Sequence, residues 1–362
     1  MATDRSERIY SDLPIPPGEL LAEELDVRGM SQKELADRTG RPEQTVSEII
    51  NGKKGITHDT ALELEKVLGI PASFWVNLEG SFQLTKARLR DLNELDRQED
   101  WLGFFPVREM KQRDLVPKTT DKREILTALL KFFGVASFTA LKQRQEAILG
   151  YRITPKSTVS LGALWTWLRE GEVQALEIDT EPYDEDRFRE ALEEIRSITT
   201  QQKPREFIQQ MSEICASAGV AFVVTKEYPK SGASGVARWL SPDMAMIQLS
   251  TKRRFCDMFW FSFFHEAKHV LDRQRRRIFV NGINDEPVSE DAANKFAADT
   301  LIPPSAWASF VATQTWSHVG VAQFAQRLGI HPEIIVGRMQ HEKVIPPNFL
   351  NDMRRRFMWS DD

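Results

Sequence analysis

Two histidines and a glutamate stand inside one of the most apolar runs of the chain, FWFSFFHEAKHVLDRQRRR, from Phe259 to Arg277. On a helix, residues four apart share a face at a separation of about 6 Å, so His265 and His269 can direct their imidazoles at one ion. Glu266 is offset from that face and suits a general base better than a third ligand. This HExxH spacing predicts a metallopeptidase site in which zinc activates water and polarises a carbonyl.

The residues around the motif indicate that its helix is buried. A surface helix keeps a polar face, whereas apolar side chains surround this one almost completely: Phe255, Met258, Phe259, Trp260, Phe261, Phe263, Phe264, Val270 and Leu271. A buried histidine pair costs roughly several kcal/mol unless it is hydrogen-bonded or bound to something. We therefore expect a central helix with one polar edge that holds the ion.

A catalytic zinc needs a third protein ligand and one open position. The acids that follow the helix are Asp272, Asp285, Glu286, Glu290 and Asp291. Glu290 is favoured because it opens the segment SEDAANKFAADTL, in which Ala293, Asn294 and Ala297 share its face and allow close packing. Glu286 and Asp291 are the alternatives, and a solvated helix N-terminus explains any single acid of this group.

Three segments, GVARWLSPDMAMIQLS, FWFSFFHEAKHVL and EDAANKFAADTLIPP, resemble in sequence and order the ImmA/IrrE family of metallopeptidases, which is implicated in cleaving repressors. The resemblance implies one zinc ion per chain, bound by His265, His269 and Glu290, with Glu266 as the base. Lys268 departs from the family, where this position is most often glycine. A lysine next to a divalent cation weakens binding or closes the cleft unless it extends to the surface.

A second motif lies near the N-terminus, in SQKELADRTGRPEQTVSEIINGKKGIT. A helix from Ser31, a turn at Gly40 and a second helix from about Pro42 to Gly52 predict a helix-turn-helix. Packing positions fall on Leu35, Ala36, Val46 and Ile49. The residues expected to face the major groove are Glu43, Gln44 and Ser47, and those expected to contact phosphates are Gln32, Lys53 and Lys54.

The segment from Pro14 to Trp75 resembles the XRE-type helix-turn-helix, and in particular the HigA-like antitoxin repressors. The resemblance implies a double-stranded DNA operator, and half-site readers of this kind usually pair, so we expect a homodimer. Residues 1–80 carry nine Lys and Arg against fifteen Asp and Glu, a net charge of −6. Non-specific DNA affinity should therefore be weak, and a helical bundle for protein contacts is the alternative.

Composition indicates a globular chain with more than one domain. Of 362 residues, 41% are hydrophobic and 28% charged, with a net charge of −5. No apolar run approaches the roughly 18 residues of a membrane helix, and MATDRSERIYSD lacks the apolar core of a secretory signal. We expect a cytoplasmic protein without membrane contact, whose Cys215 and Cys256 are small buried side chains.

The order of patterns predicts a mainly helical α+β fold in four regions. A five-helix helix-turn-helix domain takes residues 1–80, and a helical connecting domain takes 81–200. An ImmA/IrrE-like peptidase core takes 201–305, with strands at VAFVVT, GVARWL and MAMIQLS followed by the HExxH helix. Residues 306–362 form a helical C-terminal region.

The leading functional hypothesis is a DNA-binding, antitoxin-like regulator with a zinc endopeptidase domain, which cleaves a repressor, a partner or itself in a toxin-antitoxin, phage or stress switch. The alternative is a non-catalytic repressor that uses a peptidase-like scaffold to bind its partner. Lys268 favours the alternative, whereas Glu266 favours the enzyme because a structural site needs no base. Tyr228, Arg238 and the histidines of the tail are open candidates for the oxyanion-stabilising residue.

Overall fold

The computed structural model describes residues 13–149, 159–251, 255–273, 287–314 and 316–356. The chain forms two compact units, Met1–Glu99 and Asp100–Asp362. The mainly helical fold with a small sheet agrees with the sequence pattern, whereas the limits of the four predicted regions stay predictions.

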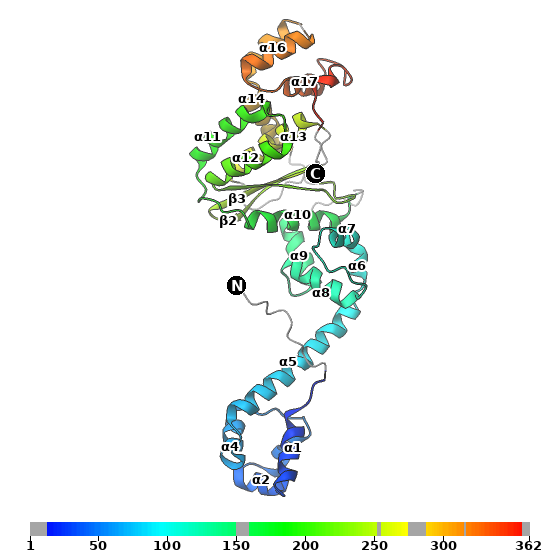
Figure 1. The fold of residues 1–362 in the computed structure, drawn as a ribbon, viewed down its shortest axis with the longest axis vertical. Coiled ribbons are helices and arrows are strands. Elements are labelled where there is room, and N and C mark those ends of the chain that lie inside the picture. The colour runs from blue at the N-terminus through cyan, green and yellow to red at the C-terminus, as the bar shows by residue number, and fades with distance from the viewer. Residues whose placement is uncertain (1–12, 150–158, 252–254, 274–286, 315, 357–362) are drawn as a thin grey trace. The chain divides into compact units, whose positions relative to one another are not determined.

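Five helices make up the described part of the first unit: α1 (Pro17–Val27), α2 (Gln32–Thr39), α3 (Glu43–Ile50), α4 (His58–Leu68) and α5 (Ala72–Asp96) (Figure 1). Side-chain caps begin two of them, because the hydroxyls of Ser31 and Thr57 accept backbone N–H bonds three residues on. Left-handed glycines, Gly40 and Gly69, end the same two helices. The apolar faces of the five helices form one core, which includes the fully buried Trp75.

Helix α5 is longer than the sequence pattern suggested, and the domain boundary expected after residue 80 falls inside it. The expected boundary coincides with Gly80. This glycine has no left-handed backbone and open space where a Cβ would stand, so nothing interrupts the hydrogen-bond ladder there. A glycine alone weakens a helix by about 0.5–1 kcal/mol without ending it.

The second unit begins with helices α6 (Asp100–Phe104), α7 (Val107–Gln112), α8 (Lys122–Phe133), α9 (Phe138–Leu149), α10 (Leu161–Leu176) and α11 (Glu185–Ser197). One stretch of the described residues, Lys122–Glu146, is long and apolar enough to cross a membrane by length and composition, and a third of its most apolar window is buried. Gly134, with φ of +63°, caps α8 and divides this stretch into two short helices.

A three-stranded sheet follows α12 (Pro204–Ser217), at the three places where strands were predicted. The strands are β1 (Val220–Thr225), β2 (Gly235–Ser241) and β3 (Met244–Ser250), in the order β1-β3-β2. Strand β3 pairs in parallel with β1 and antiparallel with β2, so β2 is an edge. Helix α10 lies on one face of the sheet, and α12 and α13 (Cys256–Leu271) cover the other (Figure 1).

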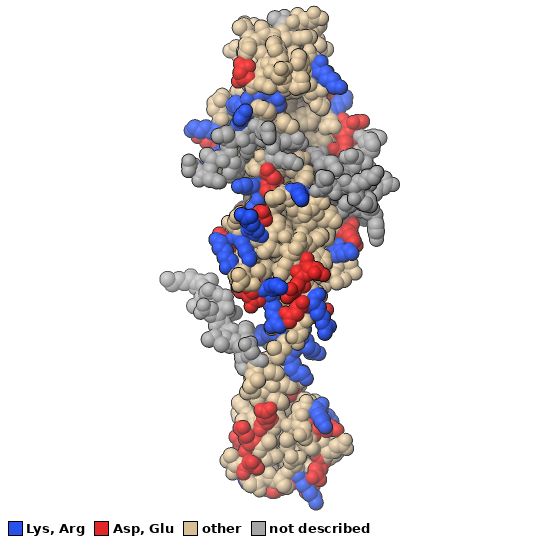
Figure 2. Space-filling model, turned by 90° about the vertical axis from the view of Figure 1, so that its right-hand side faces the viewer, with Lys and Arg blue, Asp and Glu red and all other residues tan. Residues whose placement is uncertain are grey.

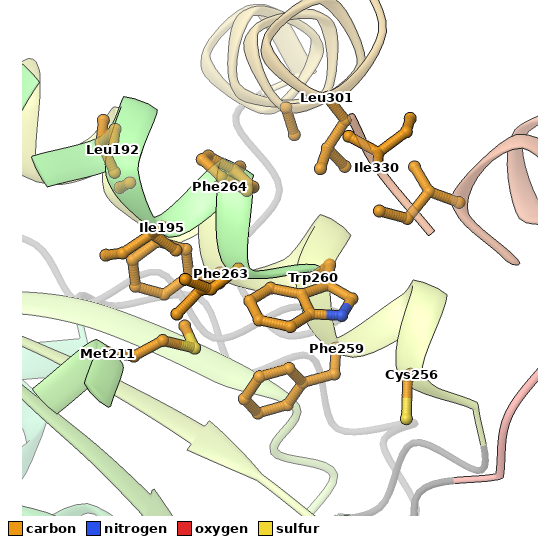
Figure 3. Packing of buried hydrophobic residues seen from close by; sticks show 14 of the residues in the cluster. Leu192, Ile195, Met211, Cys256, Phe259, Trp260, Phe263, Phe264, Leu301 and Ile330 are labelled. Carbon is orange, nitrogen blue, oxygen red and sulfur yellow. The ribbon is translucent and has the colours of Figure 1, made fainter. Parts of the chain in front are cut away.

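Helix α13 is the centre of the second unit. Its Phe259, Trp260, Phe263 and Phe264 are almost fully buried against side chains of α11 and α12, among them Met211 (Figure 3). Four further α-helices follow among the described residues of this unit: α14 (Pro287–Leu301), α15 (Pro304–Ala312), α16 (His318–Leu328) and α17 (Pro332–His341). Both α14 and α17 pack on α13, so they determine what stands beside its polar edge.

Candidate functional site

The structure brings three predicted ligands together in the second unit. His265 and His269 lie on one face of α13, and Glu290 reaches them from the first turn of α14. Glu290 Oε2 lies 3.2 Å from His265 Nε2, and its Oε1 lies 3.5 Å from His269 Nε2. The two Nε2 atoms are 3.3 Å apart. This is the one group of three or more His, Cys, Asp or Glu side chains with metal-ligand geometry among the residues described.

These separations fit a zinc ion. Ligands at about 2.0–2.1 Å from a tetrahedral zinc lie about 3.4 Å from one another. The two imidazole nitrogens are 3.3 Å apart, and each lies 3.2 or 3.5 Å from one of the two carboxylate oxygens of Glu290. Two imidazole nitrogens and one carboxylate also match the donor set of catalytic zinc sites. Burial alone would raise the pKa of Glu290, but the neighbouring imidazoles lower it to about 2. The carboxylate is therefore ionised, as a cation ligand must be.

Asn294 orients one of the imidazoles from the opposite edge of its ring. Its Oδ1 lies 3.0 Å from His265 Nδ1. An amide oxygen only accepts, so Nδ1 carries a proton, and in the neutral imidazole Nε2 then presents its lone pair towards Glu290 and His269. The sequence pattern places Asn294 on the face of Glu290 and predicts only a packing role for it. The signal was its position four residues, about one helical turn, after Glu290.

Glu266 lies beside this group and points towards the edge strand β2. The backbone N–H of Ala237 donates to its carboxylate, and burial raises its pKa to about 8. Its Oε2 is buried without a hydrogen-bond partner among the described residues. Gly235 provides the space, because a Cβ there would stand 2.6 Å from Glu266 Oε1. A buried glutamate beside the ligand group, with one oxygen free of hydrogen bonds, has the position of a general base.

Lys268, the residue that departs from the family pattern, turns away from the ligands. Its ammonium pairs with Asp272 one turn further along α13, and 27% of its side chain is exposed. Its charge is therefore neutralised at the helix end. Asp291 is exposed and lies outside the ligand group, while Glu286 and most of the RQRRR run lie outside the described residues.

The other polar residues considered for catalysis are occupied elsewhere. The Tyr228 hydroxyl donates to Glu170, and the Arg238 guanidinium donates to Glu172. Both acids belong to α10, which covers the face of the sheet opposite α13 (Figure 1).

The histidines of the tail have separate positions. His331 caps the N-terminus of α17, with its Nδ1 accepting from the Glu333 backbone N–H. His318 pairs with Asp352 at 2.7 Å on the surface. His341, at the end of α17, lines a cavity beside α13.

The first unit presents the predicted recognition helix, α3. Val46 and Ile49 are buried against α1 and α2, while Glu43 and Gln44 are exposed. Ser47 is half-buried, and Asn51 donates to its backbone oxygen at 2.8 Å and to its hydroxyl at 3.3 Å. The exposed face of α3 is therefore short and polar, as a helix that reads base edges requires.

The residues predicted to hold phosphates flank this helix. Gln32 is exposed in the first turn of α2, and Lys53 and Lys54 are exposed after α3. The backbone N–H groups of both lysines donate to the backbone carbonyl of Glu48, and these bonds fix the turn in which the two lysines lie. Acidic and basic side chains are mixed on the face of this unit shown in Figure 2, so a uniform basic surface does not assist binding there.

The comparisons with known proteins concern the first unit. A helix-turn-helix family model matches residues 21–75. Virulence-associated protein I of Dichelobacter nodosus is 38% identical over 74 residues, which cover 20% of this chain and 68% of that protein. Antitoxin HigA-1 of Vibrio cholerae is 36% identical over 78 residues, which cover 21% of this chain and 73% of that protein.

Among solved structures, an addiction module antidote protein of a HigA family from Coxiella burnetii is 39% identical, with a TM-score of 0.22. It covers 23% of this chain and 92% of its own. Each of these matches takes in less than a quarter of the present chain, so the metal-ligand group in the second unit rests on its own geometry.

Proposed function

We propose that this chain, which belongs to the helix-turn-helix family through its N-terminal unit, is an operator-binding regulator that also carries a zinc-dependent endopeptidase. The first unit binds double-stranded DNA through α3, and it does so as a homodimer. The second unit cleaves a repressor, a partner protein or the chain itself. Both activities belong to the cytoplasm, where operators and repressors are found.

One observation carries the peptidase half of this proposal. A buried glutamate with an unpaired oxygen, Glu266, stands beside two imidazoles and a carboxylate at zinc-ligand separations. A purely structural zinc site fills all four positions with protein ligands, whereas a catalytic site keeps one open and has a base nearby. The pairing of Lys268 with Asp272 supports the proposal, because it draws the ammonium towards the end of the helix.

Each residue then has a defined task. His265, His269 and Glu290 hold the zinc ion, which supplies Lewis-acid chemistry for peptide hydrolysis when bound. Asn294 keeps the proton on His265 Nδ1 so that Nε2 stays free for the ion. Glu266 takes a proton from the attacking water and delivers it to the leaving amine. The Ala237 N–H fixes one oxygen of this carboxylate and leaves the other for the reaction.

The proposal is tested with the full chain in two assays. In the first, zinc-loaded and chelator-treated protein is incubated with the proteins encoded next to its gene, and fragments are identified by mass spectrometry. In the second, the chain is footprinted on the DNA upstream of its own gene. We expect zinc-dependent fragments and a two-fold symmetric footprint. Absence of fragments with every neighbour and with the chain itself would refute the peptidase half, and absence of a footprint would refute the regulator half.

A further inference from the structure

A cavity of about 610 Å³ lies between α13, α14 and α17, next to the metal-ligand group. Its volume is within the roughly 300–1,000 Å³ typical of small-molecule sites. Met258 and Phe261 of α13 form part of the lining with Leu301, Ile302 and Ile334, of which the last three are buried. The lining is thus mainly apolar and comes from three helices of one packed unit.

The charged groups around this cavity are already neutralised. Asp257 pairs with Arg354 at 2.8 Å, Arg338 pairs with Glu342 at 2.8 Å, and Lys295 pairs with Asp299. A ligand therefore meets no unpaired charge among these groups, which favours an uncharged occupant.

Asn294 supplies a polar group for such an occupant. It lines the cavity, and its side-chain oxygen is engaged by His265. The amide NH₂ remains, and it can only donate hydrogen bonds. An occupant that recognises this group must therefore offer an acceptor, such as a carbonyl oxygen.

The cavity adjoins the metal-ligand group on the Asn294 side of His265, whereas Glu290 lies on the other side of that ring. The two ring nitrogens of His265 lie on different edges of the imidazole, with Nε2 towards Glu290 and Nδ1 towards Asn294. Phe261, another lining residue, has its ring centroid 6.4 Å from that of His265. An occupant thus contacts the residue that holds a metal ligand in place, without entering the ligand sphere.

We propose that this cavity binds a small, largely apolar organic molecule with a hydrogen-bond acceptor, and that the bound molecule tightens metal binding through Asn294. A hydrogen bond accepted from the amide NH₂ polarises the amide and strengthens its oxygen as an acceptor for the His265 N–H. This makes His265 Nε2 a better metal ligand. The cavity is then the effector site of the proposed peptidase, and the coupling rests on that proposed function.

The test uses benzamide, which has an aromatic ring and an amide acceptor, and benzene, which lacks the acceptor. Binding to the full chain is followed by ligand-observed NMR, and the zinc Kd is measured by competition with a chelator at saturating probe. Ala298→Trp and Met258→Trp each place an indole in the cavity, so one remains if the other fails to fold. Ala322→Trp, on the exposed side of α16, is the matched control.

We expect benzamide to bind wild type and Ala322→Trp, and to bind the filled variants at least about tenfold more weakly. Bound benzamide should lower the zinc Kd about fivefold or more, and zinc should lower the benzamide Kd by the same factor, because linkage is reciprocal. The effect on zinc should vanish with benzene and in Asn294→Ala.

The proposal is overturned if benzamide does not bind, if the filled variants bind it like wild type, or if it leaves the zinc Kd unchanged. Displacement of benzamide by a cleaved peptide, with no change in zinc affinity, would also overturn it and identify a substrate subsite. Benzamide binding to zinc-free protein reports on the cavity alone, and a zinc titration without probe reports on the metal centre alone. Failure of one is therefore distinguishable from failure of the other.

Discussion

The Nε2 atoms of His265 and His269 face each other at 3.3 Å in a buried setting. When His265 is neutral, with its proton on Nδ1 beside Asn294, the Nε2 lone pair of that ring points at a second nitrogen and at an ionised carboxylate. A cation between these groups removes their repulsion. The helical i,i+4 spacing produces this arrangement, and the predictions below follow from it and from the packing around it.

Asn294→Ala should weaken zinc binding by about 10- to 100-fold, the usual effect of removing a hydrogen-bond partner of a ligating histidine. Asn294→Asp should restore affinity, because a carboxylate also accepts from Nδ1. Lys295→Ala, at the next position of α14 and exposed, is the control and should bind zinc like wild type. Competition with a chromogenic chelator measures all three, and equal affinities for Asn294→Ala and wild type would show that Asn294 does not orient the ligand.

Gly18→Ala should destabilise the first unit. A Cβ at Gly18 would stand 2.1 Å from the carbonyl oxygen of Ile49 on the recognition helix, so backbone must move, at a cost of about 1–3 kcal/mol. Gly80→Ala is the matched helical control, because its Cβ meets nothing within 4 Å, and it should stabilise by about 0.5–1 kcal/mol. Calorimetry of the full chain measures the stability of both variants. A Gly18→Ala variant as stable as wild type would contradict the packing of α1 on α3.

The second unit should lose stability in acid through His331. Burial, together with Arg355, lowers the pKa of His331 to about 4 from an ordinary value of 6.5. Well above pH 6.5, His331 is neutral in both the folded and the unfolded protein, so it adds no pH dependence to the stability. As pH falls from 6.5 towards 4 the unfolded state takes up a proton that the folded state does not, which costs on the order of 2 kcal/mol.

His331→Asn isolates this contribution, because asparagine also caps a helix but does not titrate. The difference in Tm, wild type minus variant, should fall by several degrees between pH 7 and pH 4.5, as each kcal/mol moves Tm by about 2–4 °C in a unit of this size. Nearby Glu333 titrates in both proteins and drops out of the difference. A difference that stays constant with pH would show that His331 takes up its proton equally in both states.

Substitutions at the predicted base contacts and at the predicted phosphate contacts should change operator binding in different ways. Gln44→Ala should reduce discrimination at one base pair by about 1–3 kcal/mol, whereas Lys53→Ala should weaken all sequences equally and reduce the salt slope by about 1. Lys66→Ala, exposed on α4, is the control. Fluorescence anisotropy over a salt series distinguishes these effects. If Gln44→Ala lowers affinity uniformly, α3 does not read bases through this residue.

Local patterns in the sequence were sufficient to predict most of the helices and strands. The three strands were predicted with nearly their observed limits because Pro, Gly and Ser separate them, and α2 and α3 because Ser31 and Gly40 mark their ends. The boundary expected after residue 80 falls inside α5, because only the surroundings of Gly80 show that one helix continues through it.

Long-range packing decided what the sequence left open at the candidate site. The role of Asn294 depends on how closely α14 approaches α13, and the pairing of Lys268 depends on its rotamer. Tyr228 and Arg238 looked available in the sequence, but α10 binds both from across the sheet. A contact between elements far apart in sequence leaves no local pattern, so such residues could not be assigned beforehand.

The most direct test of the central claim compares Glu266→Gln with Glu290→Gln for zinc content and for cleavage of the substrate protein. Glu266→Gln should keep about one zinc per chain and lose cleavage, because it removes the base and leaves the ligands intact. Glu290→Gln should lose both, because a neutral amide replaces a ligand. A Glu266→Gln variant that cleaves like wild type would contradict the account.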